Sequence, residues 1–230
     1  MRGLKRRHAI NITMHFVTVV VTRSASICVK TLHTLLNLNK LSAQNKFTNE
    51  IVYVNDDLFE RKDVLLKKAK TCDRIIWIDY SVYVDIPSLE KLVDKFIPGY
   101  HCLVLPCVTP DVDWDMFKQK IKKGSTEPIG QMGLNFDTAV GKSIGEHLHV
   151  VTYTDPKSWA IDTKHVLKAI KGNKGEGIVI SAKVSEMFKK FIERDIKIYA
   201  FTAANLIVTY PHECLGNILE SAGIGFKQDS

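Results

Sequence analysis

Three groups of polar residues follow apolar, strand-like runs in this chain and carry its most chemically useful side chains. They are Thr22-Arg23-Ser24, Asn55-Asp56-Asp57 and Asp79-Tyr80-Ser81. The carboxyl ends of parallel strands meet at one edge of a sheet, so we expect the three groups to lie together. An arginine pairs with phosphate, a carboxylate accepts hydrogen bonds from a base or ribose, and an acid can hold a divalent cation on a diphosphate. The groups therefore predict a nucleotide site.

Asp79 is the most informative of these residues, because the apolar run that begins at Arg74 stops abruptly at it. An acid at the carboxyl end of a buried strand is expected to face a ligand or a metal ion. The alternative explanation is that aspartate and serine are simply favourable turn residues after a strand.

Strand-like and helix-like runs alternate along the chain, which predicts an α/β fold with a mostly parallel central sheet flanked by helices. The expected strands are His15–Val21, Glu50–Asn55, Arg74–Asp79, His101–Pro106, His149–Thr154, Lys197–Phe201 and Asn205–Tyr210. The expected helices are Ser26–Leu41, Leu58–Lys70, Pro87–Phe96, Asp111–Lys122, Pro156–Ile170 and Ser181–Arg194. Residues 123–146, with five glycines, are expected to be irregular, and either a substrate-binding loop or a mobile loop explains such a stretch.

No linker or internal repeat divides the 230 residues, so we expect a basic extension over residues 1–13 and a single domain over 14–230. The basic start resembles a signal peptide or a membrane anchor. Its apolar core Phe16–Val21 is short and ends close to Arg23, which favours a first core strand and no transmembrane span.

The net charge of +7 favours anionic partners, but most lysines fall in helix-like segments, where a solvated face explains them. No aromatic residues interleave with basic runs, so no nucleic-acid module is expected. The five cysteines are odd in number and lack CxxC spacing, which indicates reduced thiols in a cytosol-like compartment. Attachment to the periphery of a membrane and association with a virion are the alternatives.

Two further patterns fit known motifs poorly. The segment Phe136–Ser143 ends like a phosphate-binding loop but lacks its first glycine and a preceding strand. The alternating acids of Asp111–Asp115 lack the turn glycine and the final acid of a calcium loop, so helix capping explains them better. Neither is expected to bind a ligand.

Several short motifs together resemble nucleotide-sugar glycosyltransferases of the GT-A fold, particularly the compact viral and fungal-type members. They are Thr22-Arg23-Ser24, the pattern Trp77-Ile78-Asp79-Tyr80-Ser81-Val82, a helix headed by Pro87, and a strand leading to Leu105-Pro106-Cys107. The likeness extends over about residues 14–215. It implies a single GT-A-like, Rossmann-like domain that transfers a sugar from a UDP- or GDP-linked donor to a glycan or protein acceptor.

The resemblance also implies a divalent cation, Mn²⁺ or Mg²⁺, because the family binds the metal and the diphosphate with an Asp-x-Asp motif. Here the motif is Asp79-Tyr80-Ser81, and a serine hydroxyl is a weaker ligand for a hard cation than a carboxylate. The family often supplies a late histidine to the metal, and His212 is the matching residue.

The segment Lys157–Thr163 resembles the acceptor side of the family. The resemblance implies that Trp159 stacks on the acceptor sugar and that Asp162 contacts the acceptor hydroxyl. In an inverting enzyme Asp162 would be the general base; in a retaining enzyme it would not. The alternative explanations are that Trp159 is an aromatic residue of the core and that Asp162 is a local helix or turn cap.

Two other functions remain open at this point. The missing second acid fits a catalytically inactive binding or assembly protein of the same fold. The same sheet edge also suits another nucleotide-dependent α/β transferase, such as a nucleotidyltransferase or a methyltransferase. The oligomeric state is not readable from the sequence.

Overall fold

A mixed α/β fold built on one large sheet is seen in the computed structural model, which describes residues 14–23, 26–94, 100–170 and 180–208. The expected basic extension over residues 1–13 lies outside this part of the chain. The sheet has eight strands, in the order β2 (Thr48–Asn55), β1 (His15–Thr22), β3 (Arg74–Ile78), β10 (Ser158–Asp162), β5 (Cys102–Leu105), β11 (Ile198–Phe201), β9 (Leu148–Thr154) and β8 (Thr138–Gly145).

The centre of the sheet is mostly parallel, as the alternating pattern predicts. Strands β2, β1 and β3 pair in parallel, and so do β5 and β11. Strand β10 lies between β3 and β5 and is antiparallel to both, so β3 and β5 run in the same direction. The carboxyl ends of five strands therefore lie at one edge of the sheet.

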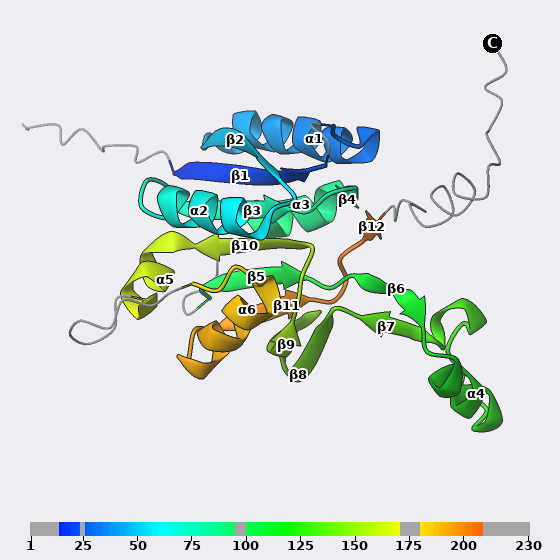
Figure 1. Cartoon of the computed structure of the whole chain (residues 1–230). Helices are drawn as coiled ribbons and strands as arrows, with labels where there is room; N and C mark the ends of the chain where they lie inside the picture. The colour runs from blue at the N-terminus through cyan, green and yellow to red at the C-terminus, as the bar shows by residue number, and fades with distance from the viewer. Residues whose placement is uncertain (1–13, 24–25, 95–99, 171–179, 209–230) are drawn as a thin grey trace, which may run out of the picture.

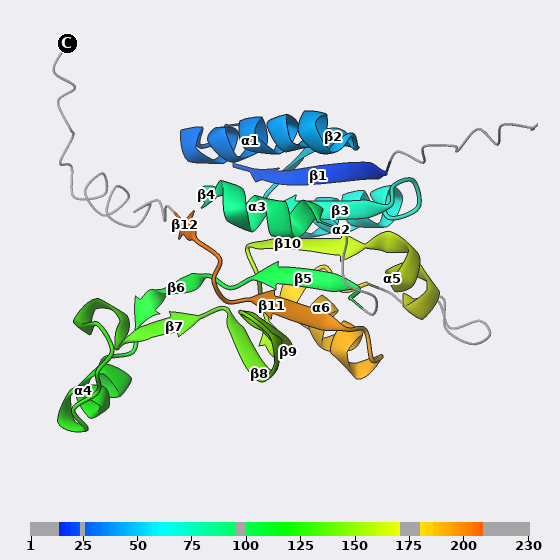
Figure 2. The same ribbon diagram turned by 180° about the vertical axis from the view of Figure 1, so that it is seen from behind.

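Helices cover both faces of the sheet (Figures 1 and 2). Helices α2 (Leu58–Lys68), α5 (Thr163–Ile170) and α6 (Val184–Glu193) pack on one face, and α1 (Val29–Asn45) and α3 (Ile86–Val93) on the other. A hydrophobic core lies on each face of the sheet, and successive apolar side chains of β1 point alternately into one core and the other, as strand geometry requires. A strand buried on both faces reads as a continuous apolar run, which explains why β1 and β3 are evident in the sequence. No helix in the described part of the chain is long and apolar enough to cross a bilayer.

Smaller elements extend beyond the carboxyl edge. Strand β4 (Val82–Val84) pairs with β12 (Leu206–Val208), and β6 (Val108–Val112) pairs with β7 (Leu134–Phe136). The β6–β7 pair carries helix α4 (Trp114–Lys122) and a short 3-10 turn at Ile129–Gln131. This arm projects away from the main sheet in both views (Figures 1 and 2).

Two expectations about local structure were wrong. The helix expected over Pro156–Ile170 begins only at Thr163, because Ser158–Asp162 forms strand β10. Four of its five residues are buried between β3 and β5, and a short run buried on both faces has no period that separates strand from helix. The glycine-containing stretch 123–146 is not irregular throughout, since it contains β7 and β8.

The burial of Trp159 corrects the expectation that its ring stacks on an acceptor sugar. The side chain is 1% exposed, stacks on Trp77 with ring centroids 5.4 Å apart, and meets the edge of Phe188 at the same separation. A ring packed in this way has no face open to a ligand. Trp159 is a core residue that joins the sheet to helix α6.

Replacement of this core residue tests that assignment. We expect Trp159→Ala to lower the free energy of unfolding by about 3–5 kcal/mol, because it leaves a large cavity in the core. Trp114→Ala is the matched control, since Trp114 is 63% exposed on the arm and its loss is expected to change stability by no more than about 0.5 kcal/mol. Urea denaturation measures both, and equal effects would contradict the assignment.

Candidate functional site

The ends of β1, β2 and β3 meet at the carboxyl edge, as the sequence predicts. Thr22 pairs with Asn55 across β1 and β2, and the main-chain nitrogen of Asp56 donates to the carbonyl of Thr22 at 2.9 Å. Val20 pairs with Ile78, the last residue of β3. This register brings Arg23, Asp56 and Asp79 to one place on the edge.

Arg61 links the acids of two strands. Its Nη2 lies 2.6 Å from Asp56 Oδ1 and 2.9 Å from Asp79 Oδ1, and Arg23 Nε lies 2.7 Å from Asp56 Oδ2. The Arg61 side chain is only 11% exposed, so these charge-assisted contacts are partly shielded from water. Asp56 therefore fixes two guanidinium groups at the edge of the sheet.

Sequence reasoning missed Arg61, although a signal for it exists. Asp57 caps helix α2 by accepting hydrogen bonds from the main-chain nitrogens of Phe59 and Glu60. A residue four positions after the cap lies about one turn into the helix, close to the strand ends. The predicted ligand-binding carboxylate of Asp57 is thus engaged in capping.

Asp79 has one oxygen engaged and one available. Its Oδ1 accepts from Arg61 and from the main-chain nitrogen of Tyr80, and the Asp79 nitrogen donates to the carbonyl of Lys157 at 2.8 Å. Within the described residues, nothing donates a hydrogen bond to Asp79 Oδ2. The neighbouring Tyr80 ring lies under the Arg23 guanidinium, 5.1 Å from its centroid. Tyr80 therefore helps to hold that arginine at the edge.

A cavity of about 320 Å³ opens over these groups. Besides Arg23, Asp56, Arg61 and Asp79, charged side chains from two other segments line it, namely Asp155, Lys157 and Lys183. Val184 and Ser185 also contribute, at the amino end of α6, where main-chain N–H groups and the helix dipole favour an anion. The lining has four basic and three acidic side chains, and its basic groups together with the helix terminus can bind a diphosphate.

A second cavity of about 390 Å³ lies alongside the first. It is lined by Thr22, Asn55, Glu60 and Tyr53, among others. The chain neighbours Arg23, Asp56 and Arg61 line the first cavity, so the two spaces are adjacent. Together they have the size range of a small-molecule site, and they combine a part whose single charged side chain is Glu60 with a part that contains four basic and three acidic side chains.

Ser81 does not join the cavity lining. It is buried in the turn between β3 and β4 with φ of 58°, a left-handed conformation that serine tolerates at some cost. Its hydroxyl is therefore poorly placed for the metal role that the motif implies. His212, the other implied ligand, lies outside the described residues.

Asp162 lies at the wrong end of the sheet for its predicted catalytic role. Because β10 is antiparallel to β3, Asp162 pairs with Arg74, the first residue of β3, while Ser158 pairs with Ile78. Asp162 and Asp79 are thus separated by the length of the strand, more than about 13 Å at 3.3 Å per residue. The prediction that Asp162 is the general base was wrong, since the resemblance did not indicate the direction of this strand.

The described residues contain no cluster of three or more histidine, cysteine, aspartate or glutamate side chains that could hold a metal ion. Among the described residues that line the cavity, Asp79 Oδ2 and the carboxylate of Asp155 have no hydrogen bond or ion pair and are available to a cation. Magnesium and manganese commonly take one or two protein carboxylates and complete their shell with phosphate oxygens and water. The residues present therefore fit a cation that arrives with a diphosphate and do not form a closed metal centre.

Asp137 is a second feature that the sequence did not reveal. It is 7% exposed, and its Oδ1 accepts from the Cys107 nitrogen at 3.0 Å and from Thr138 Oγ1 at 2.8 Å. Its Oδ2 is buried and has no hydrogen-bond partner. Burial raises the pKa of Asp137 from 3.8 to about 6, although these hydrogen bonds and the charge of Lys157 oppose the shift.

The raised pKa of Asp137 makes stability depend on pH. The folded state binds the proton more tightly than the unfolded state, so the stabilising contribution is complete below about pH 4 and is lost as the pH rises through 6. We expect Asp137→Asn, which cannot ionise, to gain up to about 3 kcal/mol relative to the natural chain between pH 4 and pH 8. Urea melts of both proteins across this range measure it, and parallel stability curves would contradict it.

Comparisons with known proteins give similarities of fold only. No protein-family model matches the chain, and no curated protein does. Among solved structures, the chain is similar to A197 from STIV, with a TM-score of 0.49, 13% identity and 86% of each chain covered. It is also similar to a glycosyltransferase involved in glycosylation of the major capsid of PBCV-1, with a TM-score of 0.38, 8% identity and 81% of each chain covered.

A third similar structure is GalNAc-T7 with UDP, GalNAc and Mn²⁺, with a TM-score of 0.49 and 12% identity. The match covers 87% of this chain and 44% of that one. Glycosyltransferases are thus among the solved structures that this chain resembles.

Proposed function

We propose that the chain is a glycosyltransferase that binds a nucleotide-diphosphate sugar at the carboxyl edge of its sheet. The observation that carries this proposal is the contact of Arg61 with both Asp56 and Asp79, inside a cavity that also contains Arg23, Lys157 and the amino end of α6. This arrangement suits a diphosphate with a nucleoside on one side. The motif resemblance to GT-A enzymes supports the same donor.

Each charged group has a separate task in this proposal. Arg61, Lys157 and Lys183 bind the diphosphate and stabilise the negative charge that develops on it as the sugar leaves. Asp56, whose two oxygens are both paired with arginines, positions Arg23 and Arg61 and does not itself contact the ligand. The cavity lined by Thr22 and Asn55 takes the nucleoside.

Asp79 Oδ2 would hold a Mn²⁺ or Mg²⁺ ion in the complex with the donor. Such an ion supplies further positive charge to the leaving diphosphate. The basic side chains also supply positive charge to the diphosphate. We therefore expect the metal to strengthen donor binding, and we expect some binding to persist without it. A role for His212 as a further metal ligand remains a prediction from the family resemblance.

Calorimetry with UDP, GDP and their sugars, with and without Mn²⁺, tests the donor site. We expect binding of at least one of these nucleotides, strengthened by the metal. Asp79→Asn should weaken binding in the presence of Mn²⁺ by about tenfold, a loss of about 1.4 kcal/mol. Asp162→Asn is the matched control at the other edge of the sheet and should bind as the natural chain does.

Absence of binding by all these nucleotides, or equal effects of the two substitutions, would contradict the donor site. Preference for a nucleoside triphosphate or S-adenosylmethionine would indicate a different transferase. Release of UDP or GDP from the bound sugar nucleotide, followed over time, separates an enzyme from a binding protein of the same fold.

A further inference from the structure

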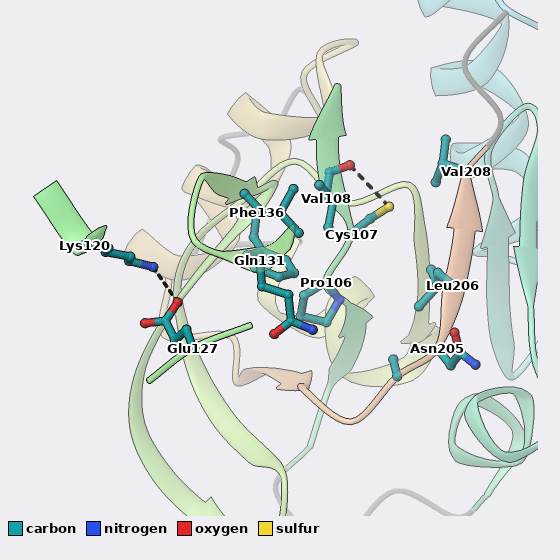
Figure 3. Close-up of a pocket in the computed structure, with 12 residues that line it drawn as sticks. Pro106, Cys107, Val108, Lys120, Glu127, Gln131, Phe136, Asn205, Leu206 and Val208 are labelled. Carbon is teal, nitrogen blue, oxygen red and sulfur yellow. Dashed lines mark hydrogen bonds and ion pairs between the residues drawn. The ribbon is translucent and has the colours of Figure 1, made fainter. Parts of the chain in front are cut away.

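A cavity larger than the two at the donor site lies apart from them. It has a volume of about 740 Å³ and lies between the end of β5, the projecting arm and the segment that joins β11 to β12. Figure 3 shows Lys120 and Glu127 on one side of it, Asn205 and Leu206 on the other, and Gln131 between them. Its volume is in the range of cavities that enclose small organic ligands.

The charges that line this cavity cancel each other. Lys120 Nζ and Glu127 Oε2 form an ion pair at 2.7 Å, and no other ionisable carboxylate, guanidinium or ammonium group is in the lining. The donor cavity, in contrast, contains four basic and three acidic side chains, and so has an excess of one positive charge. Since no net charge is available to neutralise an anion, the larger cavity favours an uncharged ligand.

The lining of the same cavity contains both neutral polar side chains and apolar side chains. Within the described residues, the side-chain amides of Gln131 and Asn205 make no hydrogen bond, so both are available to a ligand. Phe136 lines the wall with 56% of its surface exposed, and Pro106 adds an apolar surface near it (Figure 3). Amides that donate and accept, set beside an aromatic face, match a sugar ring, which has hydroxyls at its rim and C–H groups on its faces.

Asp137 connects this cavity to the donor site. Its chain neighbour Phe136 and its hydrogen-bond partner Cys107 line the larger cavity. Its carbonyl accepts from the nitrogen of Asp155, which lines the donor cavity together with Lys157. The two cavities are therefore joined through one buried residue at the carboxyl edge.

We propose that the larger cavity binds a neutral saccharide, held by Gln131 and Asn205 against the face of Phe136. The proposal that the ligand is a saccharide is based on the volume of the cavity and on the residues that line it. The further statement that this saccharide is the acceptor of the transfer rests on the proposed function.

Saturation-transfer NMR with neutral disaccharides (lactose, maltose and xylobiose) at millimolar concentration tests the site. We expect at least one to bind, and a sulfated disaccharide to bind more weakly. Phe136→Ala and Asn205→Ala should each weaken binding by about tenfold. The main-chain contacts of Asn205, to Ser88 Oγ and from the Asp85 nitrogen, do not involve its side chain, so this variant is expected to fold.

Two matched controls accompany these variants. Tyr153→Ala removes an aromatic side chain that is similarly exposed but lines none of the cavities described, and Asn135→Ala makes the same change as Asn205→Ala on an exposed part of β7. Both should bind the disaccharide normally. Absence of binding by every neutral disaccharide, or binding that is unchanged in Phe136→Ala and Asn205→Ala, would overturn the proposal.

The donor-binding measurement separates this proposal from the proposed function. Nucleotide binding without saccharide binding would overturn the saccharide site alone. Saccharide binding that depends on Phe136, without nucleotide binding, would support the saccharide site while contradicting the donor site.

Discussion

The insertion of strand β10 between β3 and β5, antiparallel to both, is the constraint on which the rest of the site depends. Because β10 runs against its neighbours, the segment that precedes it faces the carboxyl edge, and the segment that follows it faces away. The carbonyl of Lys157 therefore accepts a hydrogen bond from the nitrogen of Asp79, whereas Asp162 lies at the opposite edge of the sheet. The stacked pair Trp77 and Trp159 fixes this register in the core.

The charged groups of the candidate donor site are held in place before any ligand arrives. Arg61 contacts acids that follow two different strands, and Arg23 contacts one of these acids and the ring of Tyr80. Long basic side chains lose rotamer entropy when they are fixed on a ligand, and here part of that cost is met on folding. A site of this kind stabilises developing charge with little rearrangement.

The sequence predicted the features that depend on local pattern. Buried parallel strands are continuous apolar runs, so β1 and β3 and the polar residues after them were evident. The strand β10 was missed because five residues buried on both faces show no period. Asp137 was missed because its partner Cys107 is 30 residues away in the chain. Arg61 has a near partner in Asp56, but the contact that joins two strand ends is with Asp79, 18 residues away.

The position of Asp137 has a thermodynamic consequence for the two cavities. Its carboxylate holds the main chain of one cavity wall, and its carbonyl holds the main chain of the other. A ligand that shifts this residue from one side alters the affinity on the other side, and linkage requires the effect to be reciprocal. If both proposed ligands bind, this single buried aspartate would couple their affinities.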